Sequence, residues 1–233
     1  MPGEGKLIVL EGPDDAVIEA QMRRLVRWLR GQGIAVEQTG EPTYGPVGAQ
    51  IRLFQQGRLQ IDPHSLALLW TADRMDHLGR EDGILSWLAD GRHVLCARYL
   101  LFSYACQLDH VELDWLKRIN ARCRHPDLTL FLDVDPAQRT RSPNPCESFE
   151  SNLRKGEKEK LRQNYWTIMD TLQREEGDAA WPSPIVIVDL AAPGVAASLD
   201  TTSVLDRIAI PDESAELVLS ETCRRYVAEL LGL

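Results

Sequence analysis

The sequence predicts a doubly wound α/β domain, in which a parallel sheet of about five strands has helices on both faces. Short apolar runs alternate along the chain with longer segments of helical periodicity, as in a parallel sheet that is buried on both sides. The first run, residues 7–10, leads through a glycine turn directly into a helix pattern, which is how a βα unit begins. With 233 residues, of which 44% are hydrophobic, the chain is large enough for one such domain with a sizeable core.

The first βα unit sets the pattern for the rest of the chain. Four side chains of its helix recur on one stripe, which should face the core: Val17, Gln21, Leu25 and Leu29. Further strands are predicted at the apolar runs of residues 34–38, 93–97, 128–134 and 185–189. Helices are predicted at residues 47–56, 81–89 and 114–123. Another helix should begin at Asp62, because Asp is a good N-cap and the following Pro63 suits the first turn.

Composition excludes several classes of function. A formal net charge of −9 and a pI of about 5.1 argue against general nucleic-acid binding. No apolar run approaches the roughly 18 residues of a membrane span, and the amino terminus has no apolar signal core. Five cysteines without a C-x-x-C pair indicate free thiols in a reducing compartment, and the dispersed histidines lack metal-ligand spacing. We therefore expect a cytoplasmic protein that binds no metal through histidine, no nucleic acid and no membrane.

Two segments differ from the main domain, which is predicted to span residues 1–210. Residues 138–150 hold two prolines and mixed charge, and are predicted to form a loop. Residues 211–233 form a C-terminal helical extension with an apolar stripe. Because that stripe would otherwise face water, we expect the helix to be docked on the domain or on a partner subunit.

The turn after the first strand has the frame of a phosphate-binding loop, whose pattern is G-x-x-x-x-G-K-[ST]. Gly12 fills the first position, but Val17, Ile18 and Glu19 stand where the pattern requires glycine, lysine and a hydroxyl residue. A β-branched valine resists the loop conformation, the cation is missing, and a carboxylate lies where an anionic ligand would bind. Residues 6–21 are equally consistent with a simple strand–turn–helix unit that has no phosphate-binding role.

Five segments in register resemble the thymidylate kinase family, whose members transfer phosphate from ATP to dTMP. They are KLIVLEGPD, the Glu41-Pro42 loop with Gly48, IDPHSLALLWTADRMDH, VLCARYLLFSYACQ and PDLTLFLDVDP. The resemblance covers roughly residues 5–210. It implies the fold of a P-loop nucleoside monophosphate kinase, a homodimer packed through helices, and ATP with Mg²⁺ as the phosphate donor.

The resemblance implies that the acceptor side of the nucleotide site is partly retained. Trp70 stands where a phenylalanine of the family stacks on thymine, and an indole can also stack. Arg74 matches an arginine near the base, and Arg98 matches an arginine that contacts the dTMP phosphate. The complete set of nucleotide-binding candidates is Gly12, Asp14, Trp70, Arg74, Arg98, Tyr99 and Gln107.

Most departures from the family pattern fall on the catalytic side. Besides the three changed loop positions, Ala97 replaces an aspartate that helps to organise magnesium, and Gly40 replaces an arginine. Phe102 and Cys106 replace a serine and a tyrosine of the third-strand motif. These changes argue against binding of ATP and Mg²⁺ by this chain.

Three arginines remain as candidate catalytic cations. They are Arg98 and the two arginines of the 138–150 loop, Arg139 and Arg141, where the family has its lid. Pro143 and Pro145 interrupt the helix that would present the lid arginines to ATP.

The retained residues also have structural explanations. A tryptophan on an apolar helix face, such as Trp70, belongs to the core more often than to a base platform. Arg74 and Arg98 could be ion-pair partners, and Asp133 and Asp135 could cap the end of a strand and the following helix.

Three functions are consistent with these features. The chain could be a thymidylate kinase homologue that has lost phosphoryl transfer and binds dTMP, a related nucleotide or a protein partner. It could be an active kinase in which Lys6, Arg139, Arg141 or Lys155 supplies the missing cation. It could be a structural or regulatory subunit without a ligand. Convergence of Trp70, Arg74 and Arg98 on one open cleft would favour nucleotide binding.

Overall fold

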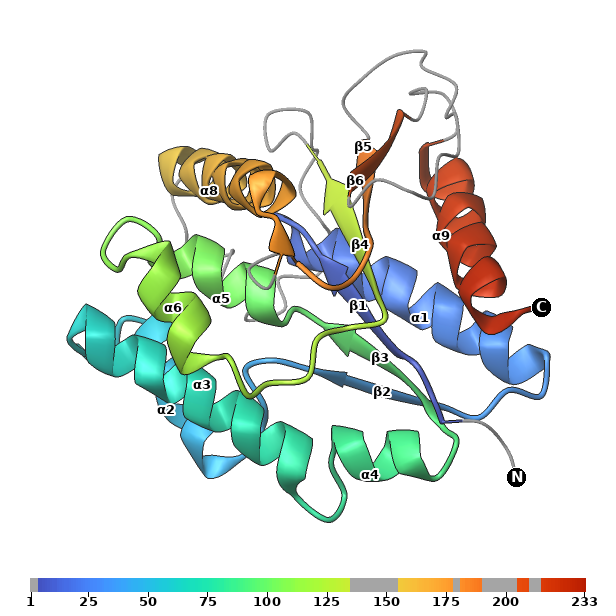
Figure 1. Ribbon diagram of the computed structural model, residues 1–233, viewed down its shortest axis with the longest axis horizontal. Helices are drawn as coiled ribbons and strands as arrows, with labels where there is room; N and C mark the ends of the chain where they lie inside the picture. The colour runs from blue at the N-terminus through green and yellow to red at the C-terminus, as the bar shows by residue number, and fades with distance from the viewer. Residues whose placement is uncertain (1–3, 135–154, 178–180, 190–204, 210–214) are drawn as a thin grey trace.

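The predicted doubly wound α/β fold is confirmed by the computed structural model, which describes residues 4–134, 155–177, 181–189, 205–209 and 215–233. A twisted sheet runs through the molecule, and all of its neighbouring strands are parallel (Figure 1). The strands are β1 (Leu7–Glu11), β2 (Val36–Gly40), β3 (His93–Ala97), β4 (Leu128–Asp133), β5 (Ile185–Asp189) and β6 (Leu205–Ala209). Their order in the sheet is β2-β3-β1-β4-β5-β6, so β6 adds an edge strand to the five that were expected.

The chain reverses its direction across the sheet at β1. From β1 it runs outward to β2 and β3, and it then returns to β4 on the other side of β1. In such open parallel sheets, ligands bind at the carboxyl ends of the strands beside this switch point. The carboxyl ends of β1 and β3 lie side by side there, with Leu10 opposite Ala97 in the register.

Helices cover both faces of the sheet (Figure 1). One face carries α1 (Asp15–Gly31) and α9 (Ala215–Leu231), which pack against each other. The helices associated with the other face are α2 (Pro46–Gln55), α3 (Pro63–Gly79), α4 (Ile84–Ala89), α5 (Leu100–Gln107), α6 (Leu113–Ile119) and α8 (Lys155–Arg174). Because side chains alternate along a strand, Leu7 and Val9 of β1 enter one apolar cluster while Ile8 and Leu10 enter the other.

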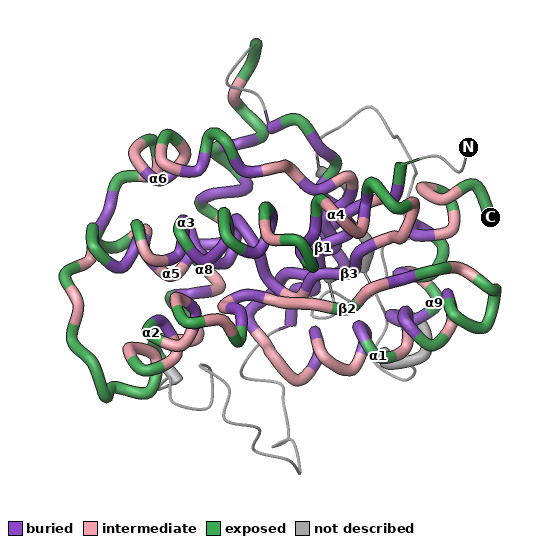
Figure 2. Tube along the Cα trace, turned by 90° about the horizontal axis from the view of Figure 1, so that it is seen from below, coloured by how far each residue is buried: buried purple, intermediate pink, exposed green. Residues whose placement is uncertain are grey.

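The apolar stripe predicted for the first helix is buried in α1. Val17, Gln21, Leu25 and Leu29 all face the sheet, and Ile18, Met22 and Val26 join them. The C-terminal helix is docked on the same face, with Leu219, Cys223, Tyr226 and Val227 buried against the cluster beneath α1. The tube of Figure 2 shows the result, with β1 and β3 largely buried inside, β2 mostly of intermediate exposure, and exposed outer turns on the helices.

Several further predictions can be compared with the structure. The strands at 93–97 and 185–189 are confirmed residue for residue, and Asp62 caps α3 through the backbone N–H groups of His64 and Ser65. The four described cysteines, which are Cys96, Cys106, Cys123 and Cys223, are free thiols. Within the residues that the structure describes, no helix combines the length and the apolar character of a membrane span.

Candidate functional site

Gly12 turns the chain from β1 towards α1 at the carboxyl edge of the sheet. Its φ of 155° is rarely adopted by residues with a side chain. A Cβ at this position would lie 2.5 Å from the carbonyl oxygen of Leu132 at the end of β4. Both the backbone conformation and the packing of the loop on β4 therefore require glycine here.

The N-terminus of α1 is capped by a side chain of the chain itself. Asp14 is the N-cap, and its side chain accepts a hydrogen bond of 3.1 Å from the backbone N–H of Val17. The N–H of Ile18 donates to the backbone oxygen of Asp14 at 3.2 Å. Because the helix begins at Asp15, the positions that a phosphate loop uses for glycine and lysine lie inside the first turn. The side chain of Ile18 is only 1% exposed and packs in the core.

Glu19 lies on the outer side of α1. Its carboxylate pairs with Arg23 one turn later at 3.3 Å, and both side chains are well exposed. This is a helical i, i+4 pair of the ordinary surface kind. Glu19 also contributes to the wall of the second cavity described below.

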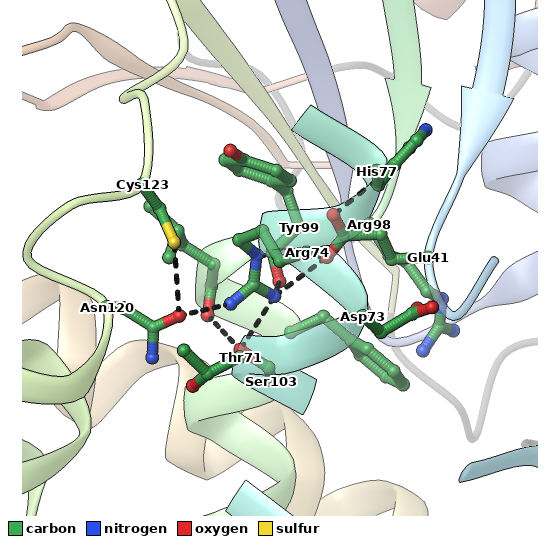
Figure 3. Close-up of polar contacts among 12 residues, drawn as sticks. Glu41, Thr71, Asp73, Arg74, His77, Arg98, Tyr99, Ser103, Asn120 and Cys123 are labelled. Atoms are coloured by element: carbon green, nitrogen blue, oxygen red, sulfur yellow. Dashed lines mark hydrogen bonds and ion pairs between the residues drawn. The ribbon is translucent and has the colours of Figure 1, made fainter. Parts of the chain in front are cut away.

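Arg74 of α3 lies in the interior, where each of the three nitrogens of its guanidinium donates at least one hydrogen bond (Figure 3). Its Nε donates to Glu41 at 2.9 Å, and its Nη1 donates to Asn120 at 2.6 Å. Its Nη2 donates to the backbone oxygen of Tyr99 at 2.9 Å and to Ser103 Oγ at 3.1 Å. Burial is the largest single effect and would lower the pKa of Arg74, but the Glu41 carboxylate and smaller contributions from neighbouring tyrosine and cysteine side chains together raise the pKa above its ordinary value.

Glu41 links Arg74 to the loop between β2 and α2, residues 41–45, which is called the second loop below. Its other carboxylate oxygen lies 3.2 Å from His77 Nδ1, and His77 Nε2 lies 2.7 Å from Thr39 Oγ1. One turn earlier on α3, Asp73 accepts hydrogen bonds of 2.8 and 2.6 Å from the backbone N–H and the hydroxyl of Thr43. The loop that follows β2 is thus held on α3 by a buried polar network, of which Figure 3 shows the contacts of Glu41 with Arg74 and His77.

Arg98 follows β3 and has a left-handed backbone conformation, with a φ of 63°. Such a conformation is uncommon outside glycine and has an energetic cost that the surrounding contacts must offset. Its guanidinium forms an ion pair with Asp15 and lies 3.6 Å from the centroid of the Phe102 ring. The side chain is buried, although Arg98 lines a cavity.

Glu11, which was not among the residues predicted for the site, is a fully buried carboxylate beneath Arg98. Its Oε1 accepts hydrogen bonds from the backbone N–H groups of Tyr99 (2.9 Å) and Phe102 (3.3 Å). Its Oε2 accepts a hydrogen bond of 2.9 Å from the hydroxyl of Tyr165 on α8. Burial raises the pKa of Glu11 to about 7, against the opposing effects of the Tyr165 hydrogen bond and the Arg98 charge. The signal in the sequence was a carboxylate placed at the end of a wholly apolar strand.

Two cavities are lined by residues of this region. The first has a volume of about 610 Å³ and is lined by residues of α2, α3, α5 and α8, among them Phe54, Trp70, Gln107 and Leu161. The second has a volume of about 910 Å³ and lies at the ends of β2 and β3 beside α1. Its wall includes Asp15, Glu19, Gly40, Ala97, Arg98 and Phe102.

The structure therefore distributes the predicted site residues over several places. Trp70 and Gln107 line the first cavity, and Arg98 lines the second. Arg74 and Tyr99 are interior residues that line neither of these cavities, so Trp70, Arg74 and Arg98 do not converge on one open cleft. The lid arginines Arg139 and Arg141 lie outside the residues that the structure describes.

A parallel sheet that reverses at β1, a glycine loop leading into α1 and cavities at the carboxyl edge define the fold of a P-loop nucleoside monophosphate kinase. The family model for thymidylate kinase matches residues 10–179. The chain belongs to the thymidylate kinase family.

Individual relatives agree with this assignment. A probable thymidylate kinase of Pyrococcus abyssi is 34% identical over 175 residues, which cover 71% of this chain and 83% of the relative. A thymidylate kinase of Desulfotalea psychrophila is 31% identical over 169 residues, which cover 72% of this chain and 82% of the relative. The solved thymidylate kinase of Candida albicans has the same fold, with a TM-score of 0.66 at 18% identity over 97% of this chain and 92% of that one.

Proposed function

We propose that this chain is a thymidylate kinase homologue that has lost phosphoryl transfer from ATP to dTMP and keeps a ligand cleft on the acceptor side. The observation that carries the proposal is that Asp14 occupies the backbone N–H groups at the N-terminus of α1. Asp14 uses its carboxylate and its carbonyl on the N–H groups of Val17 and Ile18. Those amides are among the donors that a phosphate loop directs at its ligand.

The missing lysine is not replaced by another lysine among the described residues that line the second cavity. Three further arginines line it, and each has other contacts. Arg23 pairs with Glu19, Arg80 pairs with Asp82, and Arg52 donates to backbone carbonyl oxygens.

Ile18 packs in the core and is only 1% exposed, and where it borders the second cavity it offers an alkyl side chain and no charge. Arg98, the arginine at this edge of the sheet, is held by Asp15. Lys6 pairs with Asp127 at 3.2 Å at the amino end of β1, which is the opposite end of the strand from the loop. This position argues against Lys6 as a substitute for the missing lysine of the phosphate loop.

The residues at the magnesium position do not fit the ion. Mg²⁺ in such sites is held by oxygen ligands, mainly a loop hydroxyl and carboxylates. Here the hydroxyl position holds Glu19, which is paired with Arg23 on the outside of α1, and the carboxylate position holds Ala97. Among the described residues, no three histidine, cysteine, aspartate or glutamate side chains are grouped as metal ligands.

The acceptor side retains a cavity of ligand size. Its volume of about 610 Å³ falls in the range of small-molecule sites, and its wall combines apolar side chains with a few polar groups. Trp70 and Gln107, two of the positions that match the family's nucleotide side, both lie on this wall. We therefore assign dTMP or a related compound to this side of the molecule.

A homodimer is also part of the proposal. Leu68 and Met75 lie seven residues apart on α3, and each is about half exposed. Leu53 of α2 is a further exposed apolar side chain. A helix-packed dimer of the kind implied by the family would cover such side chains.

We expect ATP–Mg²⁺ to bind with a dissociation constant weaker than about 1 mM, which corresponds to about 4 kcal/mol of binding free energy. The reason is that the loop amides are used by Asp14 and no loop lysine is present. Calorimetric titration of the full chain with ATP–Mg²⁺ measures this, with an intact thymidylate kinase titrated in parallel as the control. A micromolar dissociation constant would contradict the proposal.

A further inference from the structure

Phe102 forms a wall between the two cavities. Its ring is buried and meets the Trp70 ring edge to face, with the centroids 5.6 Å apart. Its other neighbour is the Arg98 guanidinium, 3.6 Å from the ring centroid. Trp70 lines only the first of the two cavities, and Arg98 lines only the second. Phe102 therefore lies on the direct path from the Trp70 ring to the Arg98 guanidinium. Gln55 lines both cavities, so Phe102 obstructs this direct path and does not seal the two cavities from each other.

Arg98 already holds an anion from the chain itself. Its ion pair with Asp15 is largely buried, because the two side chains are 6% and 18% exposed. Asp15 contacts Nη2 of Arg98, so a ligand phosphate at this guanidinium would have to share it with the carboxylate or displace it, and the two anions would remain close together in either case. Removal of one partner from a buried pair is costly, since the other charge is left uncompensated. The pair therefore acts against a phosphate independently of the Phe102 wall.

The first cavity has no surplus of positive charge to attract a phosphate. Its lining includes Lys160, which pairs with Asp109 at 3.1 Å, and it includes Glu157 as a further carboxylate. The charged side chains of this lining are therefore one cation, Lys160, and two carboxylates, Asp109 and Glu157, with His110 counted as neutral. Arginine, the residue best suited to bidentate phosphate contacts, does not appear among the described lining residues of this cavity.

Gln107 supplies an acceptor on the same wall. Its Nε2 donates to the carbonyl oxygen of Ser103 at 2.5 Å, and because a carbonyl only accepts, the amide oxygen must face the other way. That oxygen is buried and has no hydrogen-bond partner among the described residues. An N–H group of a neutral heterocycle would satisfy it, whereas a phosphate oxygen would repel it.

We infer that Phe102 and the Asp15–Arg98 pair divide the acceptor cleft, so that the first cavity takes an uncharged pyrimidine nucleoside and discriminates against its monophosphate. The inference rests on the proposed function, because it names the ligand class of the acceptor side described there. It assigns to Phe102 and Asp15 a role in specificity.

Paired titrations of the full chain with thymidine and with dTMP test the inference. We expect thymidine to bind at least about tenfold more tightly than dTMP, a difference of about 1.4 kcal/mol. Phe102→Ser combined with Asp15→Gly should reverse this preference, since it opens the wall and frees Arg98. Because Phe102 is a core residue, Asp15→Asn alone serves as a second variant and should reduce the preference without opening the core. Asp170→Asn, which changes an exposed carboxylate 2.8 Å from Arg174 on α8 and away from the linings of both cavities, is the matched control and should leave the preference unchanged.

The outcomes separate this inference from the proposed function. Tighter binding of dTMP than of thymidine by the unmodified chain would overturn the inference. Failure of both compounds to bind at concentrations up to about 10 mM, beyond the millimolar range of weak ligands, would overturn it as well. ADP release from ATP and dTMP, measured on the same preparation, would instead refute the loss of phosphoryl transfer.

Discussion

Replacement of Arg74 by alanine should lower the free energy of unfolding by about 3–5 kcal/mol, which is the usual effect of removing one partner of a buried ion pair. Arg74 and Glu41 are both fully buried and lie 2.8 Å apart. The alanine variant leaves Glu41 with the His77 contact but without its charged partner, and it leaves Asn120 and Ser103 without their donor. Urea unfolding of the two proteins measures the difference.

Arg92→Ala is the matched control for this variant. Arg92 contacts Glu37 and Asp90 at 2.8 Å each, but its side chain is 33% exposed and solvent screens these pairs, so its removal should cost far less stability than the removal of Arg74. Combining Arg74→Met with Glu41→Gln removes both buried charges and should recover part of the lost stability. An effect of Arg74→Ala as small as that of Arg92→Ala would show that the buried network does not hold the second loop in place.

Replacement of Glu11 by glutamine should stabilise the protein at pH 8 but have little effect at pH 5. The pKa of Glu11 is raised to about 7 from an ordinary value of 4.5, mainly by burial. Glutamine keeps an oxygen for the N–H groups of Tyr99 and Phe102, and it can donate to the hydroxyl oxygen of Tyr165. At about 1.4 kcal/mol per pH unit, the interval between the two pKa values corresponds to about 3 kcal/mol.

The sign of the Glu11 effect follows from proton binding. Below pH 4.5 the carboxyl is protonated in both states, so its contribution to stability is fully present. Between pH 4.5 and about 7 the unfolded chain releases the proton while the folded chain retains it, so this contribution falls as pH rises. Unfolding free energies of wild type and Glu11→Gln, measured from pH 4.5 to 8, should therefore diverge with rising pH. A constant difference over this range would refute the raised pKa of the buried Glu11 carboxyl.

Much of the fold could be predicted from local patterns, and its exceptions have physical causes. The strands β3 and β5 were apparent as short apolar runs bounded by polar or turn residues. The edge strand β6 was missed because Asp206 and Arg207 interrupt its apolar pattern. Helix α5 was missed because it is buried on nearly all sides, so its sequence LLFSYACQ shows no amphipathic period. Helix α8 was missed although its spacing could have revealed it, since its buried side chains recur every three or four residues: Leu161, Tyr165, Ile168, Met169 and Leu172.

The candidate site shows where sequence reasoning stops. The absence of a loop lysine can be seen directly at Ile18, because the pattern has fixed spacing. The Asp15–Arg98 pair and the place of Phe102 depend on how β1, β3 and α5 are packed, so no local pattern encodes them. Arg74 matched a family position by its spacing, yet its full enclosure by α3, α5 and the second loop is a tertiary property.

The loss of phosphoryl transfer is tested most directly by a coupled ADP-release assay with ATP and dTMP. The protein must first be purified away from the kinase of the expression host. Because positioning and charge supply most of the catalysis in this reaction, loss of the loop cation and of the magnesium groups should reduce turnover far below that of an intact enzyme. We predict turnover below about 0.001 per second, against about 1 per second at the low end for kinases. Turnover of about 1 per second that disappears in Arg98→Ala would contradict the proposed loss of activity.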